Sequence, residues 1–276
     1  MTELFKAALL GVIQGITEFL PISSTGHLIL AEHSLGISQE TYGLSFDAAL
    51  HLGTLMAIFW FFRHVWLQLL SSIIRINPGV QSDNKNKQLI KLLLIGTVPA
   101  VVLGLLFEDV IDTLFRSPQL VAASLIIFSG ALYFAEKVGR KYKGIVKLSL
   151  VYGLLIGTAQ AVALIPGVSR SGITIAAGMW RNLQREEAAR FTFLLSAPIV
   201  AGAGVLKLLR TVNLFINGGL SRFNLLFFGV GILSAAISGY LTIKYLLKFL
   251  VHHTLYPFII YRIILGFIVL GIVFIR

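Results

Sequence analysis

The chain has 276 residues, of which 57% are hydrophobic and only 13% are charged, and its mean hydropathy is +0.87. A soluble domain carries about 25% charged residues, so this composition excludes a soluble protein and predicts a single polytopic membrane domain over residues 1–276. The lack of cysteine excludes disulfides and Cys-based metal or redox sites. We attribute the net charge of +11 to loop Lys and Arg residues that set membrane topology, and we expect no nucleic-acid partner.

The sequence predicts about six membrane-spanning helices and two interrupted apolar segments. A span needs about 20 largely apolar residues. In chain order, the elements are the interrupted segment Gly11–Ala31, spans at Phe46–Phe62, Lys91–Phe107 and Pro118–Ala135, the interrupted segment Gly157–Ala177, and spans at Phe191–Leu209, Asn224–Ile243 and Pro257–Ile275. Each interrupted segment passes through a break rich in Pro, Gly and Ser, which predicts a re-entrant helix–loop–helix hairpin. The predicted fold class is therefore an all-α integral membrane protein.

The two interrupted segments resemble each other at a constant offset of 146 residues, so that Ser23, for example, aligns with Ser169. This similarity predicts two repeats, at about 1–136 and 147–276. Irregular backbone at membrane depth persists only where it is buried in protein or lines a wet cavity. Two such breaks in matching halves point to a shared site between the repeats.

Loop charges predict that the two repeats are inverted. The loops Arg63–Lys91 and Lys137–Lys147 each hold five basic residues, whereas Glu108–Arg116 between them holds three acids and one Arg. The positive-inside rule places the first two loops in the cytoplasm and the third outside. The second hairpin then enters from the cytoplasm and returns there, while the first does the same from the outside. This arrangement is an inverted-topology repeat.

The first break places several polar residues at membrane depth. Gln14 and Glu18 are four residues apart and share one helix face. A carboxylate inside a membrane is costly and is usually functional, although Glu18 could instead be a packing residue satisfied by a Ser or Arg neighbour. The polar or small residues that follow, and that are candidates for binding or catalysis, are Ser23, Ser24, Thr25, Gly26 and His27.

A helix is expected to begin near Gly26, with at least one of the preceding hydroxyls as its N-cap. Capping is an equally good account of Ser23 and Thr25. The free amides of a helix start also favour an anion. His27 lies on the first turn of this helix, where it could exchange a proton with a phosphate or a leaving oxygen.

Arg170 lies at the deepest point of the second break. Its planar guanidinium can bind phosphate through two parallel hydrogen bonds, which makes Arg the residue best suited to an oxyanion. The alternative is a structural ion pair with Glu18 and no ligand. This break should also form a cap followed by a helix start. Its other candidates for substrate binding are Ser169, Ser171, Gly172 and Thr174.

Together the two breaks suit phosphoryl transfer from a diphosphate whose lipid tail lies in the bilayer. Arg170 and the helix starts would stabilise charge on the departing phosphate. The sequence shows no cage of His and Asp residues for a metal. A divalent cation, Mg²⁺ or Ca²⁺, could nevertheless bind Glu18 together with diphosphate oxygens, because Mg²⁺ is commonly held by one or two carboxylates and phosphate.

The motifs of the two breaks resemble the signature motifs of the bacterial undecaprenyl-diphosphate phosphatase family, of the bacitracin-resistance type. They read EFLPISSTGH at Glu18–His27 and PGVSRSGIT at Pro166–Thr174, and further segments that fit are PAVVLGLLF at Pro99–Phe107, FTFLLSAPI at Phe191–Ile199 and PFIIYR at Pro257–Arg262.

The resemblance implies an enzyme of the bacterial inner membrane that removes the terminal phosphate of undecaprenyl diphosphate. This reaction recycles the carrier lipid for cell-wall synthesis and confers bacitracin resistance. The resemblance also implies a divalent cation, an active site facing the extracytoplasmic side, and a homodimer. The family's functional roles carry over to Glu18, Ser24, His27, Ser169, Arg170 and Thr174.

Two questions stay open at this point. The family motif opens with Glu or Gln, and this first position is Gln14 here; because Gln cannot act as a base, Glu18 is expected to carry more of the metal or acid–base work. The nucleophile is Ser24, His27 or a water activated by His27.

A rival function is a secondary transporter or flippase of phospholipid-linked or anionic substrates, since inverted repeats with broken helices also build carriers. A pure carrier, however, cannot release phosphate, and a non-catalytic scaffold leaves the polar breaks unexplained.

Overall fold

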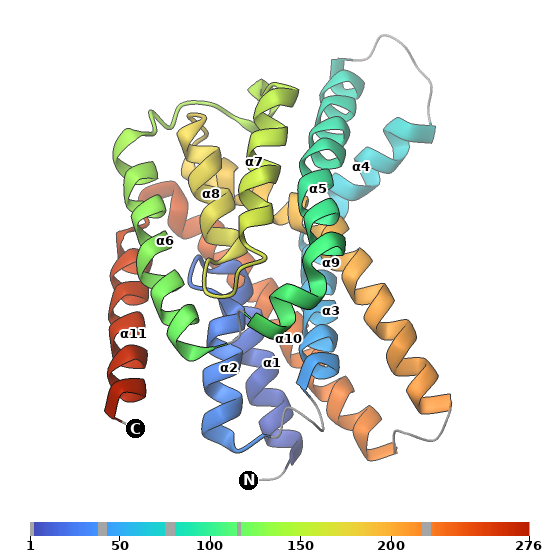
Figure 1. Ribbon diagram of the computed structural model, residues 1–276. Coiled ribbons are helices and arrows are strands. Elements are labelled where there is room, and N and C mark those ends of the chain that lie inside the picture. The colour runs from blue at the N-terminus through green and yellow to red at the C-terminus, as the bar shows by residue number, and fades with distance from the viewer. Residues whose placement is uncertain (1–2, 38–42, 75–80, 115–116, 217–221, 276) are drawn as a thin grey trace.

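The computed structural model describes residues 3–37, 43–74, 81–114, 117–216 and 222–275, and this part of the chain is almost entirely helical (Figure 1). It contains eleven α-helices and one 3-10 turn, η1 (Ile145–Lys147). The helices are α1 (Glu3–Phe19), α2 (Ser24–Leu35), α3 (Gly43–Phe61), α4 (Arg63–Ile74), α5 (Gln81–Leu114), α6 (Pro118–Val138), α7 (Leu150–Val162), α8 (Arg170–Trp180), α9 (Arg185–Ile216), α10 (Arg222–His252) and α11 (Tyr256–Ile275). The expected all-α fold is confirmed.

Four helices in the described part of the chain are long and apolar enough to cross a membrane. They are Asn84–Phe107 in α5, Pro118–Val138 in α6, Leu225–His252 in α10 and Tyr256–Phe274 in α11. The helices α3 and α4 form a fifth candidate span if they are taken together, although a bend of 75° separates them. The described residues thus contain four or five of the roughly six spans expected, which identifies a multi-pass membrane protein.

The remaining expected span, Phe191–Leu209, lies within α9 and is helical along its whole length. The side chains of Ala203 and of its residues beyond Gly204 lie outside the described residues, so this span stays a prediction.

In the structure, helices extend into segments that the sequence predicts to be loops. The segment Arg63–Lys91 contains α4 and the first turns of α5. Most of the acidic segment Glu108–Arg116 continues α5 up to Leu114, and its last two residues lie outside the described residues. The basic segment Lys137–Lys147 is largely non-helical, as expected, and its Lys143 forms an isolated β-bridge with Leu183.

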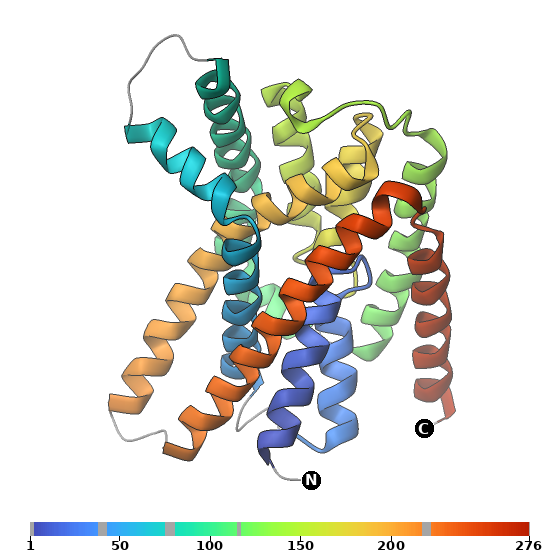
Figure 2. The same ribbon diagram turned by 180° about the vertical axis from the view of Figure 1, so that it is seen from behind.

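Two helical hairpins enter the molecule from opposite ends, and their tips meet near its middle (Figures 1 and 2). The first hairpin is α1 and α2 with the turn 20–23, and the second is α7 and α8 with the turn 163–169. Each returns to the end of the molecule from which it came. The helix α8 is buried from Ser171 to Met179, so the second tip is held deep in the protein.

Glycines let the first helix of each hairpin pack unusually close to a neighbour. A Cβ added to Gly11 of α1 would lie 2.4 Å from the carbonyl oxygen of Gly231 on α10. A Cβ added to Gly157 of α7 would lie 2.1 Å from the carbonyl oxygen of Gly96 on α5. Small residues permit such close approach between membrane helices. These contacts set the position of α1 and α7, and therefore of the two tips.

Candidate active site

The carboxylate of Glu18 is the centre of a buried polar cluster at the first tip. Its side chain is only 7% exposed. The hydroxyl of Ser24, at the start of α2, donates to Glu18 Oε2 over 2.7 Å, and Gln14 Nε2, one turn earlier on α1, donates to the same oxygen over 3.2 Å. The cost of burying the carboxylate is thus offset by charge-assisted hydrogen bonds.

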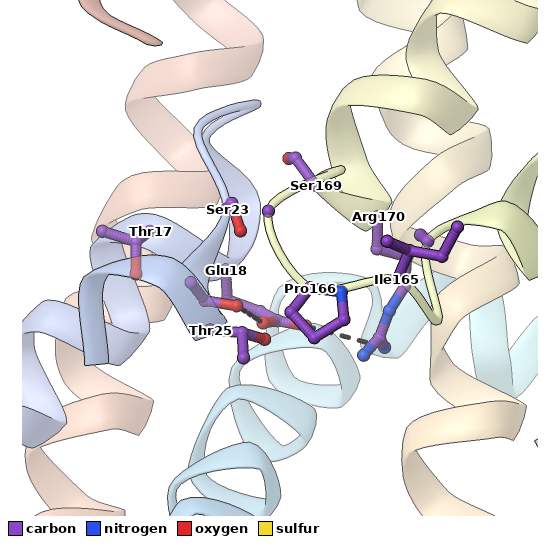
Figure 3. A pocket seen from close by; sticks show the side chains of 11 residues that line it. Thr17, Glu18, Ser23, Thr25, Ile165, Pro166, Ser169 and Arg170 are labelled. Carbon is purple, nitrogen blue, oxygen red and sulfur yellow. Dashed lines mark hydrogen bonds and ion pairs between the residues drawn. The ribbon is translucent and has the colours of Figure 1, made fainter. Parts of the chain in front are cut away.

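Arg170, the first residue of α8, faces the other oxygen of Glu18 across the gap between the two tips (Figure 3). Its Nη1 lies 3.6 Å from Glu18 Oε1, which is an ion pair but longer than the 2.7–3.2 Å of a typical N–H···O hydrogen bond. Nη1 is buried and has no hydrogen-bond partner within the described residues. The guanidinium is therefore free to donate to an additional acceptor placed between the tips.

Both tips turn through a serine with a positive φ angle, 75° at Ser23 and 73° at Ser169. The Ser169 hydroxyl accepts from the amide of Gly172 over 3.1 Å and so caps α8, while Ser23 accepts more weakly from Gly26 over 3.5 Å. The predicted caps are confirmed, although α2 begins two residues before Gly26. Each tip therefore presents a helix N-terminus, whose positive end favours an anion.

A buried arginine from the last helix holds the two tips together. Arg262 of α11 is completely buried and donates to the carbonyl oxygens of Pro21 at the first tip over 3.3 Å and of Gly167 at the second over 3.1 Å. A direct link runs between the tips as well, because Ser171 Oγ donates to the carbonyl oxygen of Leu20 over 2.9 Å. The distance between Glu18 and Arg170 is thus fixed by contacts outside their own pair.

The tips enclose a small polar cavity of about 30 Å³. Its volume exceeds the 10–15 Å³ that a single buried water requires, but it is too small for a diphosphate without some movement. The side chains and backbone that line it come from both hairpins: Thr17, Glu18, Ser23, Ser24, Thr25, Ala163, Ile165, Pro166, Gly167, Ser169 and Arg170. Figure 3 shows Glu18 and Arg170 pointing toward each other across this cavity.

His27 lies outside this polar cavity. Its Nδ1 is 2.7 Å from the carbonyl oxygen of Ser23, and its Nε2 is 2.7 Å from the hydroxyl of Tyr261 on α11, on whose ring it stacks. Both ring nitrogens are therefore engaged. Of Glu18, Ser24, His27 and Arg170, to which catalytic roles carry over from the family, the structure brings all but His27 together around the polar cavity.

Of the remaining predicted residues, some line the cavity and others lie in the helices next to it. Thr25 lines the cavity, whereas Thr174 is completely buried in α8 and its hydroxyl has no hydrogen-bond partner within the described residues. At Gly26 and Gly172 there is little room for any side chain larger than the hydrogen of glycine. A Cβ on Gly26 would lie 3.0 Å from Val121, and one on Gly172 would lie 3.1 Å from Ser169 Oγ.

Three residues of the site were not assigned a role from the sequence. His51 on α3 lies 2.9 Å from Gln14 Nε2 and 3.5 Å from Glu18 Oε2, both measured from its Nδ1. Tyr261 and Arg262 on α11 are the other two. The available signal in each case was a polar or charged side chain inside an apolar segment, since such residues are rare in membrane helices and usually face the protein interior.

The residues around Glu18 include oxygen atoms that could act as ligands of a divalent cation. Gln14 Oε1 is buried without a hydrogen-bond partner in the described part of the chain, and oxygen ligands of this kind suit Mg²⁺ and Ca²⁺. No group of three or more His, Asp or Glu side chains within the described residues could hold a metal ion by itself. Glu18 and Gln14 are thus the residues whose oxygens fit a share of the ligands of such a cation.

Known proteins resemble this chain along its whole length. The family described as "Bacitracin resistance protein BacA" matches residues 7–268. The chain is 46% identical over 271 residues to the undecaprenyl-diphosphatase of Rubrobacter xylanophilus, with 98% of each chain covered. It is 42% identical over 276 residues to that of Thermodesulfovibrio yellowstonii, with 100% of each chain covered. The chain therefore belongs to the bacitracin resistance protein BacA family.

Proposed function

We propose that the protein is an undecaprenyl-diphosphate phosphatase, which hydrolyses the terminal phosphate of a polyprenyl diphosphate and returns undecaprenyl phosphate for cell-wall synthesis. The observation that carries this proposal is the arrangement of Ser24, Glu18 and Arg170, which place a hydroxyl, a base and an oxyanion ligand at one polar cavity. Relatives at 40–46% identity over almost the whole chain carry the name undecaprenyl-diphosphatase. Bacitracin resistance follows from the same reaction.

Ser24 is the nucleophile that this geometry favours. Its hydroxyl already donates to Glu18 Oε2, as a nucleophile does to its general base. Glu18 takes the proton while Ser24 Oγ forms a bond to the terminal phosphorus. The bond from that phosphorus to the bridging oxygen breaks, and undecaprenyl phosphate leaves with the electron pair and a proton from Glu18. Water then attacks the phosphoserine, releases inorganic phosphate and returns a proton to Ser24 Oγ.

Arg170 stabilises the charge on the transferred group. In the absence of substrate it pairs loosely with Glu18 at 3.6 Å, so a diphosphate that enters the cavity competes for the same guanidinium. The release of Arg170 from Glu18 would leave the carboxylate a better base at the moment when the phosphate is bound. The amides at the starts of α2 and α8 add further donors for phosphate oxygens.

A divalent cation fits this scheme as a partner of the substrate. Glu18 and Gln14 are the residues that would hold it, with Gln14 as a neutral oxygen ligand in the position where the family motif also allows Glu. When bound, the cation neutralises part of the charge on the diphosphate oxygens.

We also infer the orientation and symmetry of the molecule from the hairpins. Their entry from opposite ends, together with the basic loops at one end, supports an inverted repeat with residues 1–136 and 147–276 as its halves. Both hairpins would then be re-entrant in the bacterial inner membrane, and the first would open to the extracytoplasmic side. A homodimer is part of the same proposal, on the strength of the family resemblance.

The experiment that tests the function is phosphate release from undecaprenyl diphosphate by purified protein with Mg²⁺ or Ca²⁺. Turnover that is lost in Ser24→Ala, Glu18→Gln and Arg170→Ala, while each variant keeps its unfolding temperature, is the expected result. If the wild-type protein releases no phosphate with either cation, the phosphatase proposal is wrong and a carrier of lipid-linked anions becomes the better account.

A further inference from the structure

An apolar groove of about 690 Å³ runs along the outside of the first hairpin, between that hairpin and α11. Its volume is within the range of about 300–1,000 Å³ that is typical of small-molecule sites. The hydrocarbon side chains that form most of its wall include Ile13, Ile16 and Leu20 from α1 and its turn, Leu30 from α2, and Phe258 and Leu265 from α11.

The groove and the polar cavity have one wall residue in common. This residue is Thr17 of α1, which precedes Glu18 of the cavity and follows Ile16 of the groove. A ligand that spans both spaces would therefore have a charged head next to Glu18 and an apolar body next to Ile16. This is the shape of a lipid diphosphate.

The polar side chains of the groove wall are already paired within the protein. Thr17 Oγ1 donates to the carbonyl oxygen of Ile13 over 2.7 Å. His27 uses one ring nitrogen for the carbonyl oxygen of Ser23 and the other for the hydroxyl of Tyr261. The wall thus presents hydrocarbon together with polar groups that need no ligand, which suits a ligand without donors or acceptors of its own.

We propose that this groove binds the isoprene units nearest to the diphosphate of the substrate. This inference rests on the proposed function and adds the location and chemistry of the lipid subsite. Because lipid tails are as apolar as the groove, the benefit of binding here is not removal from water but packing that orients the diphosphate. The part of the chain beyond the groove lies among the membrane lipids.

The position of Ile16 and its neighbour Val12 on α1 gives a matched pair for a test. The two side chains are equally exposed, at 39% and 38%, but only Ile16 lines the groove. Since the natural chain has no cysteine, the variants Ile16→Cys and Val12→Cys each carry a single thiol. The rate of thiol alkylation can then be measured with undecaprenyl phosphate, with a phospholipid of similar acyl volume, or with inorganic phosphate.

Undecaprenyl phosphate is expected to slow alkylation of the Ile16→Cys variant by about tenfold and to leave Val12→Cys unchanged, while phospholipid and inorganic phosphate affect neither. Equal protection of both variants, protection of Ile16→Cys by phospholipid to the same degree, or no protection would each overturn the proposal. This readout needs no turnover, so it separates the groove from the phosphatase activity.

A kinetic comparison uses the same pair. Ile16→Trp fills the groove and is expected to raise the KM for undecaprenyl diphosphate by about tenfold with little change in kcat, whereas Val12→Trp stays within about twofold of the wild type. If the two variants behave alike while the wild type turns over, the groove is not the lipid subsite and the phosphatase function stands. If the wild type shows no turnover, it is the proposed function that has failed.

Discussion

Ser23 and Ser169 both have an uncommon positive φ angle, of 75° and 73°, although they belong to different hairpins. Residues other than glycine rarely adopt positive φ because their Cβ crowds the backbone, at a cost of about 1–2 kcal/mol. Each serine offers its hydroxyl to the amide three residues later. The two tips are thus strained turns of the same kind, and both are maintained by their caps and by the packing around them.

This strain leads to a prediction for Ser169. The variant Ser169→Ala keeps the crowded Cβ but loses the cap on α8, so it should lower the free energy of unfolding by about 1 kcal/mol. The variant Ser169→Gly also loses the cap, but it relieves the strain and should therefore be close to the wild type. Chemical unfolding of the wild type and the two variants in detergent measures their relative free energies of unfolding. An alanine variant at least as stable as the glycine variant would contradict this account.

Glu18 should be indispensable for turnover. In Glu18→Gln the side chain keeps its size but can no longer accept a proton from Ser24, so kcat should fall by about a hundredfold or more. A phosphate-release assay at saturating substrate gives this value. Glu3→Gln, at the exposed start of the same helix, is the matched control and should keep full activity. Retained activity in Glu18→Gln would remove the general base from the mechanism.

The role of Arg170 can be distinguished from that of a general positive charge. Arg170→Lys keeps the charge but loses the planar pair of donors, and Arg170→Ala loses both. Loss of the oxyanion ligand in Arg170→Ala should lower kcat by about 10²–10³-fold, with the Lys variant between this and the wild type. Arg181→Lys, at the other end of α8, is the control. Equal activity of all four proteins would show that Arg170 serves structure alone.

The nucleophile can be identified by trapping the enzyme during turnover. Acid quenching of the wild type with substrate labelled in its terminal phosphate should leave label on the protein, because the proposed phosphoserine survives acid. The variant Ser24→Ala should carry no label and should release no phosphate, whereas Ser72→Ala on α4, far along the chain from the tips, should behave as the wild type. Continued phosphate release by Ser24→Ala would move the nucleophile to His27 or to water.

Close packing of α7 on α5 predicts that Gly157 tolerates no side chain. In Gly157→Ala the new Cβ would lie 2.1 Å from the carbonyl oxygen of Gly96, so the helices must separate, at a cost of about 1–3 kcal/mol. Gly130→Ala on α6 is the control, because a Cβ there meets no described atom within 4 Å. Thermal unfolding and phosphate release should both decline for Gly157→Ala alone. A Gly157→Ala protein as stable as the control would show that the helices adjust easily.

Much of this site could be predicted from the sequence because local rules apply to it. The four-residue spacing of Gln14 and Glu18 fixes their common face, and polar residues before an apolar run indicate the start of α2. The approach of Arg170 to Glu18 followed from the alignment of the two breaks. His51 could not be assigned in the same way, because its approach to Glu18 depends on the rotation of α3 about its own axis, and the apolar residues of α3 do not mark a single face.

The start of α5 is a second feature that could not be predicted from the local sequence. Its first residues are polar and belong to the segment Arg63–Lys91, which the sequence predicts to be a basic loop. In the structure they are helical, and two of them bond to distant elements: Asn86 Nδ2 donates to Ser72 Oγ on α4, and Gln88 Nε2 donates to the carbonyl oxygen of Leu148, each over 2.9 Å. Such tertiary contacts override a weak local preference, and the local pattern of the sequence does not reveal them.

The position of Arg262 has a consequence for how the protein is made. This residue lies in the last helix, yet it supplies the donors for backbone carbonyls at both tips, including Pro21 near the beginning of the chain. A nascent chain must therefore extend through α11 before Arg262 can bond to either tip. A nascent or truncated chain that ends before α11 would carry Glu18, Ser24 and Arg170, but of the links described above only the bond from Ser171 to Leu20 would join its two tips, so the alignment of these groups is completed only after α11 has been made.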